Sequence, residues 1–174
     1  VHLQPLIRGG GHQRGLRSGT LNVPAIVGFS KALELCYETM DGEQIRLSIL
    51  RDKMQQTFLK ELDDVYPNGH PTSRLPNNLN ISFLYAEDTA LMMGMKDIAV
   101  SSGSACSTAQ PQPSHVLKAL GISGERRHSA IRFGLGRFNT EKEVDYVINK
   151  VIDNVRSLRN SSAIYRKRVT QNNK

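Results

Sequence analysis

The sequence predicts a small α/β domain in which helices cover a mostly antiparallel sheet. Its apolar residues alternate between helical and strand-like spacing, in the order helix, helix, strand, helix, strand, loop, helix, strand, helix. The 174 residues are 39% hydrophobic, which is enough to enclose one core. No run reaches the ~18 apolar residues that a membrane-spanning helix needs, so no membrane segment is expected.

The first twenty residues are rich in glycine and arginine. Val1–Ile7 alternates loosely and predicts a strand. Glycines at 9, 10 and 11 then permit close approach of the backbone, and residues 8–20 contain three arginines together with Ser18 and Thr20. Such amides, guanidinium groups and hydroxyls suit a phosphate or a carboxylate, although a flexible glycine hinge is the more ordinary explanation of these residues alone.

Two helices are expected next. Asn22 and Pro24 predict the start of the first, whose apolar side includes Cys36 and makes it a packed, inert thiol. Asp41 and Gln44 resemble a capping pair for the second helix. That helix carries an apolar stripe at steps of three and four, formed by Leu47, Leu50, Met54, Phe58 and Leu62.

The rest of the chain alternates short strands and helices. A turn is expected at residues 67–71. Strands are expected at 79–83, 98–100 and 130–135, and short helices at 87–97 and 114–120. A longer final helix follows the capping box formed by Thr140 and Glu143.

Arg132 is an unusual residue for its strand. It stands between Ile131 and Phe133 and therefore on the opposite face from them. An arginine in a short apolar strand is costly to bury unless an anion meets it. An edge strand with a solvated arginine is the alternative that the residues leave open.

Cys106 lies in residues 101–113, a run of small and polar residues. Such a run cannot bury enough apolar surface to offset the conformational entropy lost on packing. A surface loop is therefore expected, and the thiolate of an exposed cysteine is a nucleophile. The alternative is a bystander cysteine. Cys36 is far away in sequence and no Cys or His stands at ligand spacing, so neither a disulfide nor a metal site is expected.

The net charge of +7 is concentrated at the C-terminus. Six basic residues and no acidic residue follow Asp153, which leaves a charge of about +1 on residues 1–155. This distribution indicates a solvated or partner-binding tail, and no direct nucleic-acid partner is expected.

Four segments of the sequence resemble one enzyme family. They are Gly9–Thr20, Pro76–Phe83, Ser101–Ser107 with the following His115–Gly121, and Ile131–Phe138. In this order they are similar to segments of the group I cysteine desulfurases of the IscS/NifS type. These enzymes belong to the class V aminotransferase family, which depends on pyridoxal phosphate.

The resemblance implies a fold and a division of the chain. The fold would be the small C-terminal domain of a fold-type I pyridoxal-phosphate enzyme. Residues 1–24 would end the large domain and form a loop at the dimer and cofactor phosphate. Residues 25–160 would form the small domain with the cysteine loop 101–113, and residues 161–174 a basic tail.

The resemblance also implies residue roles. Thr20 would reach the cofactor phosphate of the other subunit in a homodimer, and Arg132 would hold the α-carboxylate of L-cysteine. Cys106 would take the substrate sulfur as a persulfide and leave L-alanine. The acceptor would be an iron–sulfur scaffold protein or a sulfur-carrier protein for tRNA thiolation. Arg137 is a weaker candidate and is expected to be structural.

The cofactor lysine of the family has no counterpart in this sequence, because it belongs to the large domain. The chain is therefore expected to be a C-terminal fragment, or one half of a split enzyme, that is inactive by itself. A class V aminotransferase-like fragment and a non-catalytic scaffold module are the alternatives. The compartment, bacterial cytoplasm or mitochondrial matrix, stays undecided.

Overall fold

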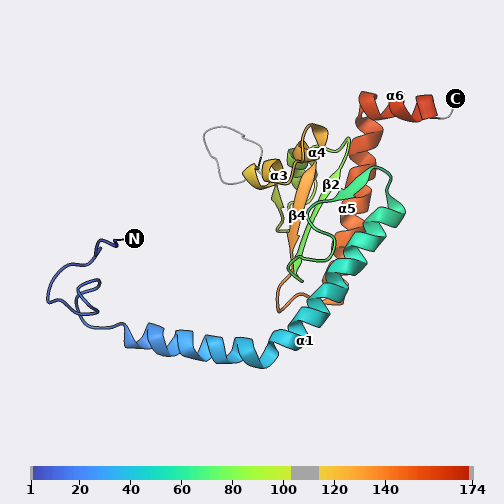
Figure 1. The fold of residues 1–174 in the computed structure, drawn as a ribbon. Helices are drawn as coiled ribbons and strands as arrows, with labels where there is room; N and C mark the ends of the chain where they lie inside the picture. The colour runs from blue at the N-terminus through green and yellow to red at the C-terminus, as the bar shows by residue number, and fades with distance from the viewer. Residues whose placement is uncertain (1, 103–113, 173–174) are drawn as a thin grey trace. The chain divides into compact units, whose positions relative to one another are not determined.

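The computed structural model describes residues 2–102 and 114–172. The chain folds as two compact units, Val1–Asp41 and Gly42–Lys174. The boundary between them falls inside the first helix, α1 (Val23–Glu61) (Figure 1).

The first unit begins with a loop that closes on itself. Ile7 and Arg17 form an isolated parallel bridge, and the backbone N–H of Ser18 donates to the carbonyl of Ile7 at 3.1 Å. The strand predicted at Val1–Ile7 is wrong for the described residues 2–7, where only Ile7 makes a bridge. Alternation alone does not produce a strand, because a strand needs a partner along its length.

Helix α1 is one continuous element where the sequence predicted two. The side chain of Asn22 accepts from the backbone N–H of Ala25 at 3.2 Å, which confirms its capping role. Asp41 does not begin a new helix. Gly42 in a helix interior costs only about 1 kcal/mol, whereas ending one helix and starting another leaves backbone groups without partners at both ends.

Cys36 is exposed, so the prediction of a packed thiol is wrong. The prediction assumed a second layer for the apolar side of its helix. Among residues 2–41 the structure contains no second helix and no sheet on which that side could pack.

The second unit contains a four-stranded sheet in the order β1-β2-β4-β3. Its strands are β1 (Val65–Pro67), β2 (Asn78–Phe83), β3 (Ser101–Ser102) and β4 (Ala130–Gly134). Every pairing between them is antiparallel, which confirms the predicted architecture.

Two details of the strand prediction are wrong. Pairing of β3 begins at Ser101, after the apolar residues 98–100 that the sequence suggested. No strand was predicted at β1, which forms just before and into the turn expected at 67–71, because Val65–Pro67 finds a partner in the far end of β2.

The remaining helices lie in the second unit. They are α2 (Asp88–Met93), α3 (His115–Ala119), α4 (Glu125–His128), α5 (Glu141–Ser161) and α6 (Ala163–Asn172). The capping box of Thr140 and Glu143 at the start of α5 is confirmed. Helix α6 occupies most of the stretch that the sequence suggested as a tail. No helix among the described residues is long and apolar enough to cross a membrane.

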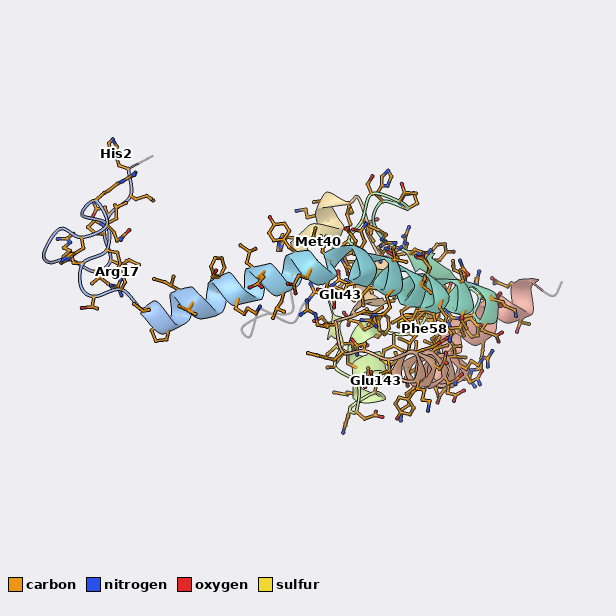
Figure 2. The ribbon with its side chains drawn as sticks, turned by 90° about the horizontal axis from the view of Figure 1, so that it is seen from below. His2, Arg17, Met40, Glu43, Phe58 and Glu143 are labelled. Atoms are coloured by element: carbon orange, nitrogen blue, oxygen red, sulfur yellow. The ribbon has the colours of Figure 1, made fainter. Side chains whose placement is uncertain are left out.

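The core lies between the sheet and the two long helices. The predicted stripe supplies Leu50, Met54 and Phe58 from α1, together with Leu62 directly after the helix. Helix α5 supplies a matching row from Val144 to Val155. Leu79, Ile81, Ile131 and Phe133 fill it from β2 and β4. Phe58, labelled in Figure 2, has no exposed surface. This packing leaves the alternate residues of β2 and β4 on the other face of the sheet.

Candidate substrate-binding face of the sheet

Arg132 stands at the centre of β4. Its neighbours Ile131 and Phe133 are buried in the core at 0% and 3% exposure. Because side chains alternate along a strand, the guanidinium of Arg132 lies on the opposite face, where the residue is exposed. The predicted placement of Arg132 away from its apolar neighbours is therefore confirmed.

Two polar residues flank Arg132 across the sheet. Asn80 of β2 is its cross-strand partner on one side, and Ser101 of β3 is its partner on the other. The guanidinium donates to the hydroxyl of Ser101 at 3.3 Å. A planar cation with two polar neighbours on an open sheet face is suited to a carboxylate.

Sequence reasoning identified Arg132 but not Asn80 or Ser101 as parts of this site. The signal for Asn80 was its polar position in the alternation of Leu79, Asn80 and Ile81. That alternation shows which face a side chain takes, but not which strand lies beside it.

Ser101 and Ser102 are also the last described residues before the cysteine-bearing segment. Beyond them, Ser114 caps α3 by accepting from the backbone N–H of Leu117 at 3.4 Å. Cys106 lies between these two points and outside the described residues. Its predicted role therefore stays a prediction.

Thr20 belongs to the first unit and is exposed. The guanidinium of Arg17 donates to the carbonyls of Gly19 and Thr20 at 3.0 and 2.6 Å. Arg17 therefore fixes the turn that presents Thr20. Arg8 and Arg14, the other two arginines of this loop, are exposed. The predicted contact of Thr20 with a phosphate stays a prediction.

Arg137 forms an ion pair with Glu43. Its Nε donates to one carboxylate oxygen at 2.8 Å and its terminal nitrogen to the other at 3.1 Å. This hydrogen bonding holds the pKa of Glu43 below its ordinary value. Arg46, also on α1, donates to the carbonyls of Arg137 and Asn139 at 2.8 and 2.7 Å. These contacts tie the loop after β4 to α1, in agreement with the structural role expected for Arg137.

A hollow of about 400 Å³ lies between the residues before β3, the end of β4 and the start of α5. The hydroxyl of Tyr146 donates to the carboxylate of Asp97 at its rim, which lowers the pKa of Asp97 and raises the pKa of Tyr146. Lys150 lies 3.7 Å from the same carboxylate. Asp97 is therefore an ionised, bonded group that is poorly suited to accept a proton.

Comparison with known proteins decides the family. The sequence profile described as aminotransferase class-V matches residues 7–147, which include Thr20 and Arg132.

The chain belongs to the class V aminotransferase family.

Its relatives within the class V aminotransferases include proteins named cysteine desulfurase IscS. The chain is 53% identical over 165 residues to the one from Anaeromyxobacter sp. (strain K) and 51% identical over 165 residues to the one from Pasteurella multocida (strain Pm70). These matches cover 95% of this chain and 41% of each relative, so the chain spans less than half the length of these proteins.

Solved structures support the same assignment. A NifS-like protein superposes with a TM-score of 0.73 at 34% identity, over 88% of this chain and 39% of its own. A NifS-like protein from Rickettsia africae superposes with a TM-score of 0.73 at 30% identity, over 88% of this chain and 40% of its own. The expected resemblance to the small domain of this class of enzyme is thereby confirmed.

The family implies pyridoxal phosphate, and the described residues fit one part of it. The exposed hydroxyl of Thr20 and the exposed Arg8 and Arg14, all in the first unit, suit its phosphate. Two lysines of the second unit are already bonded to acids. Lys53 lies within 2.7 Å of Glu141 and Asp145, and Lys150 lies beside Asp97. The described residues therefore fit the phosphate of the cofactor, but neither Lys53 nor Lys150 is suited to anchor it.

Proposed function

We propose that this chain is the C-terminal part of a cysteine desulfurase that moves sulfur from L-cysteine to Cys106. The observation that carries the proposal is the contact between Arg132 and Ser101. This contact links Arg132, which is suited to bind the substrate carboxylate, to β3, the strand that directly precedes the cysteine-bearing segment in the sequence. Cys106 stands five residues after Ser101 in the sequence, and five residues of chain span at most about 18 Å.

The proposed reaction balances without an external oxidant. The thiolate of Cys106 attacks the substrate sulfur, a sulfur–sulfur bond forms, and the carbon–sulfur bond of the substrate breaks. The electron pair of that bond stays on the substrate β-carbon, which takes up a proton and becomes the methyl group of L-alanine. Sulfur is oxidised and carbon is reduced in the same step.

The residues of this chain have separate roles in that reaction. Arg132 binds the α-carboxylate with its planar guanidinium and so orients the substrate. Thr20 binds the cofactor phosphate, in the proposed homodimer that of the partner subunit. Pyridoxal phosphate, when bound, supplies the electron sink next to the substrate α-carbon.

The division of the chain is part of the proposal. Residues 1–24 form the end of the large domain, residues 25–160 the small domain, and residues 161–174 the basic tail. The cysteine loop at 101–113 carries the persulfide to an iron–sulfur scaffold protein or a sulfur-carrier protein. By itself this chain is inactive, because the cofactor lysine belongs to the large domain.

The experiment follows the sulfur in the complete enzyme, loaded with pyridoxal phosphate and given L-cysteine. We expect mass spectrometry to detect one added sulfur on Cys106. Cys106→Ala should lower sulfide release more than about a hundredfold, because the nucleophile is lost. Cys36→Ala is the matched control and should retain the parent rate.

Two further outcomes are informative. If Cys106→Ala still produces sulfide and alanine at the parent rate, the nucleophile is misassigned and an aminotransferase-like or scaffold role gains support. The chain of 174 residues alone, treated in the same way, should yield no persulfide. A persulfide there would contradict the proposed need for the large domain.

A further inference from the structure

A row of polar side chains crosses the face of the sheet opposite the core. Asn68, directly after β1, donates its backbone N–H to the carbonyl of Asn80 at 2.8 Å. Asn80 of β2 stands opposite Arg132 of β4, and Arg132 stands opposite Ser101 of β3. Residues directly opposite each other on antiparallel strands lie about 5 Å apart at their Cβ atoms and share a face. Asn80 therefore lies between Asn68 and Arg132.

The amide of Asn68 can take only one orientation. A guanidinium nitrogen of Arg126 lies 2.8 Å from Asn68 Oδ1, and because guanidinium groups only donate, that atom must be the amide oxygen. The hydroxyl of Ser82 donates to the carbonyl of Arg126 at 2.7 Å, so it accepts from Asn68 Nδ2 at 2.8 Å. Asn68 is 2% exposed, so these bonds are held inside the protein.

The orientation of the Asn68 amide determines that of the Asn80 amide. Asn68 Nδ2 also donates to Asn80 Oδ1 at 2.7 Å, which directs the amide oxygen of Asn80 toward β1. The amide nitrogen of Asn80 diverges from the oxygen at the same carbon. It is therefore turned away from β1, and the strand on the other side of β2 is β4, which carries Arg132. The row thus orients a second donor group beside the guanidinium.

We propose that Asn80 Nδ2 donates to the same substrate carboxylate that Arg132 binds. The inference rests on the proposed function and adds a residue to its substrate site. A carboxylate has two oxygens that accept several hydrogen bonds, so it can take one from Asn80 in addition to those from Arg132. Asn80 thereby favours substrates that carry an α-carboxylate over amines that lack one, and Asn68 acts as the residue that positions it.

The test measures ligand binding separately from turnover. The complete enzyme loaded with pyridoxal phosphate is titrated with L-alanine, the product, by isothermal titration calorimetry. Asn80→Ala should raise the Kd about tenfold, because a hydrogen bond to a charged group is lost. Asn80→Asp should raise it about a hundredfold, because a second carboxylate then faces the ligand. The KM for L-cysteine should rise in parallel while kcat changes little.

The matched control is Asn78→Ala. Asn78 lies on the same strand and face, one pair along the ladder opposite Gly134. Its Oδ1 is buried and has no hydrogen-bond partner among the described residues, so its removal breaks no bond to them at that atom. We expect less than a twofold change in the Kd of L-alanine. Asn68→Ala should give an intermediate change, and the double variant with Asn80→Ala should show no further loss, since both act through one donor.

The outcomes separate the two proposals. If Arg132→Ala weakens L-alanine binding but the Asn80 variants bind within twofold of the parent, the role of Asn80 is wrong and the proposed function stands. If Arg132→Ala also leaves binding unchanged, the carboxylate site itself is wrong. Thermal unfolding verifies that each variant is folded, and Asn80→Ser replaces Asn80→Ala if the latter is not.

Discussion

Phe58 of α1 is one of the largest fully buried side chains among the described residues. Its ring centroid lies 5.4 Å from that of Phe83 in an edge-to-face arrangement and 5.8 Å from that of Phe133. The same two strands hold Asn80 and Arg132 on their other face. The packing of Phe58 on the core face thus helps to hold β2 and β4 in the pairing that places Asn80 beside Arg132.

Phe58→Ala should lower the free energy of unfolding by about 3–5 kcal/mol, because it removes a ring and leaves a cavity. Urea unfolding of this chain measures the change. Phe138→Ala is the control, since Phe138 is 89% exposed, and it should cost less than about 0.5 kcal/mol. Equal losses for the two variants would show that the core described here is not what holds the unit together.

Asn80 illustrates what residue-level sequence reasoning can and cannot provide. The alternation around it placed its side chain on the face opposite the core, and the same argument placed Arg132. Their proximity depends on β2 and β4 pairing in one register, with more than fifty residues between them. A one-residue slip would move every side chain to the other face, so only the folded sheet establishes the pair.

At the scale of elements, the start of α5 is held by a reciprocal cap. The backbone N–H of Glu143 donates to the hydroxyl of Thr140 at 3.3 Å, and the backbone N–H of Thr140 donates to the carboxylate of Glu143 at 2.8 Å. The second bond holds the pKa of Glu143 below its ordinary value. This carboxylate is therefore more readily ionised in the folded protein than in the unfolded chain.

The stabilisation from Glu143 should depend on pH with a definite sign. A lowered pKa in the folded state means that it is complete above the ordinary pKa of about 4.3 and is lost as the pH falls below that value. Glu143→Gln should therefore remove part of the stability loss between about pH 5 and pH 3 in urea unfolding. An unchanged pH dependence in this variant would contradict the role of the carboxylate.

Thr140→Ala separates the two halves of the box. It removes the hydroxyl but keeps the backbone N–H that binds Glu143, so the pH dependence should persist while stability falls by about 1 kcal/mol at neutral pH.

The sequence predicted the cap of α5 because the cap depends on two residues three positions apart. The same reasoning wrongly predicted a helix start at Asp41 and Gln44, which match the pattern but lie inside α1. A capping pattern permits a helix start without requiring one.

At the scale of the second unit, Arg159 joins several elements. It lies on α5, is 3% exposed, and donates to the carbonyls of Leu84 and Asp64 at 3.0 and 3.3 Å. Its guanidinium also lies over the ring of Tyr165 of α6, 5.4 Å from the centroid. One buried cation thus links the turns after α1 and β2 to the last two helices.

Arg159→Ala should lower the free energy of unfolding by about 2–4 kcal/mol, because it leaves buried carbonyls without their donor. The control is Arg156→Ala on the same helix. Arg156 contacts Glu61 at 3.3 Å with half of its side chain exposed, so its loss should cost less than about 1 kcal/mol. Urea unfolding compares the two, and a smaller loss for Arg159 than for Arg156 would contradict its linking role.

At the scale of the whole chain, some features follow from the sequence alone and others only from the tertiary structure. The sequence by itself determined the α/β class, the apolar stripe on α1, the faces of β2 and β4, the cap of α5 and the family resemblance. Each depends on residues that are close in sequence, where spacing alone selects the geometry. It also suggested a strand at residues 1–7, a break in α1 and a packed Cys36, which the structure contradicts.

Only the tertiary structure decided which elements lie side by side. The order β1-β2-β4-β3 brings Asn68, Asn80, Arg132 and Ser101 into one row, although they come from four separate parts of the chain. It also showed that Cys36 is exposed, because packing requires a second layer and not just an apolar side. Local patterns determine which face a side chain takes, but long-range pairing determines what it meets there.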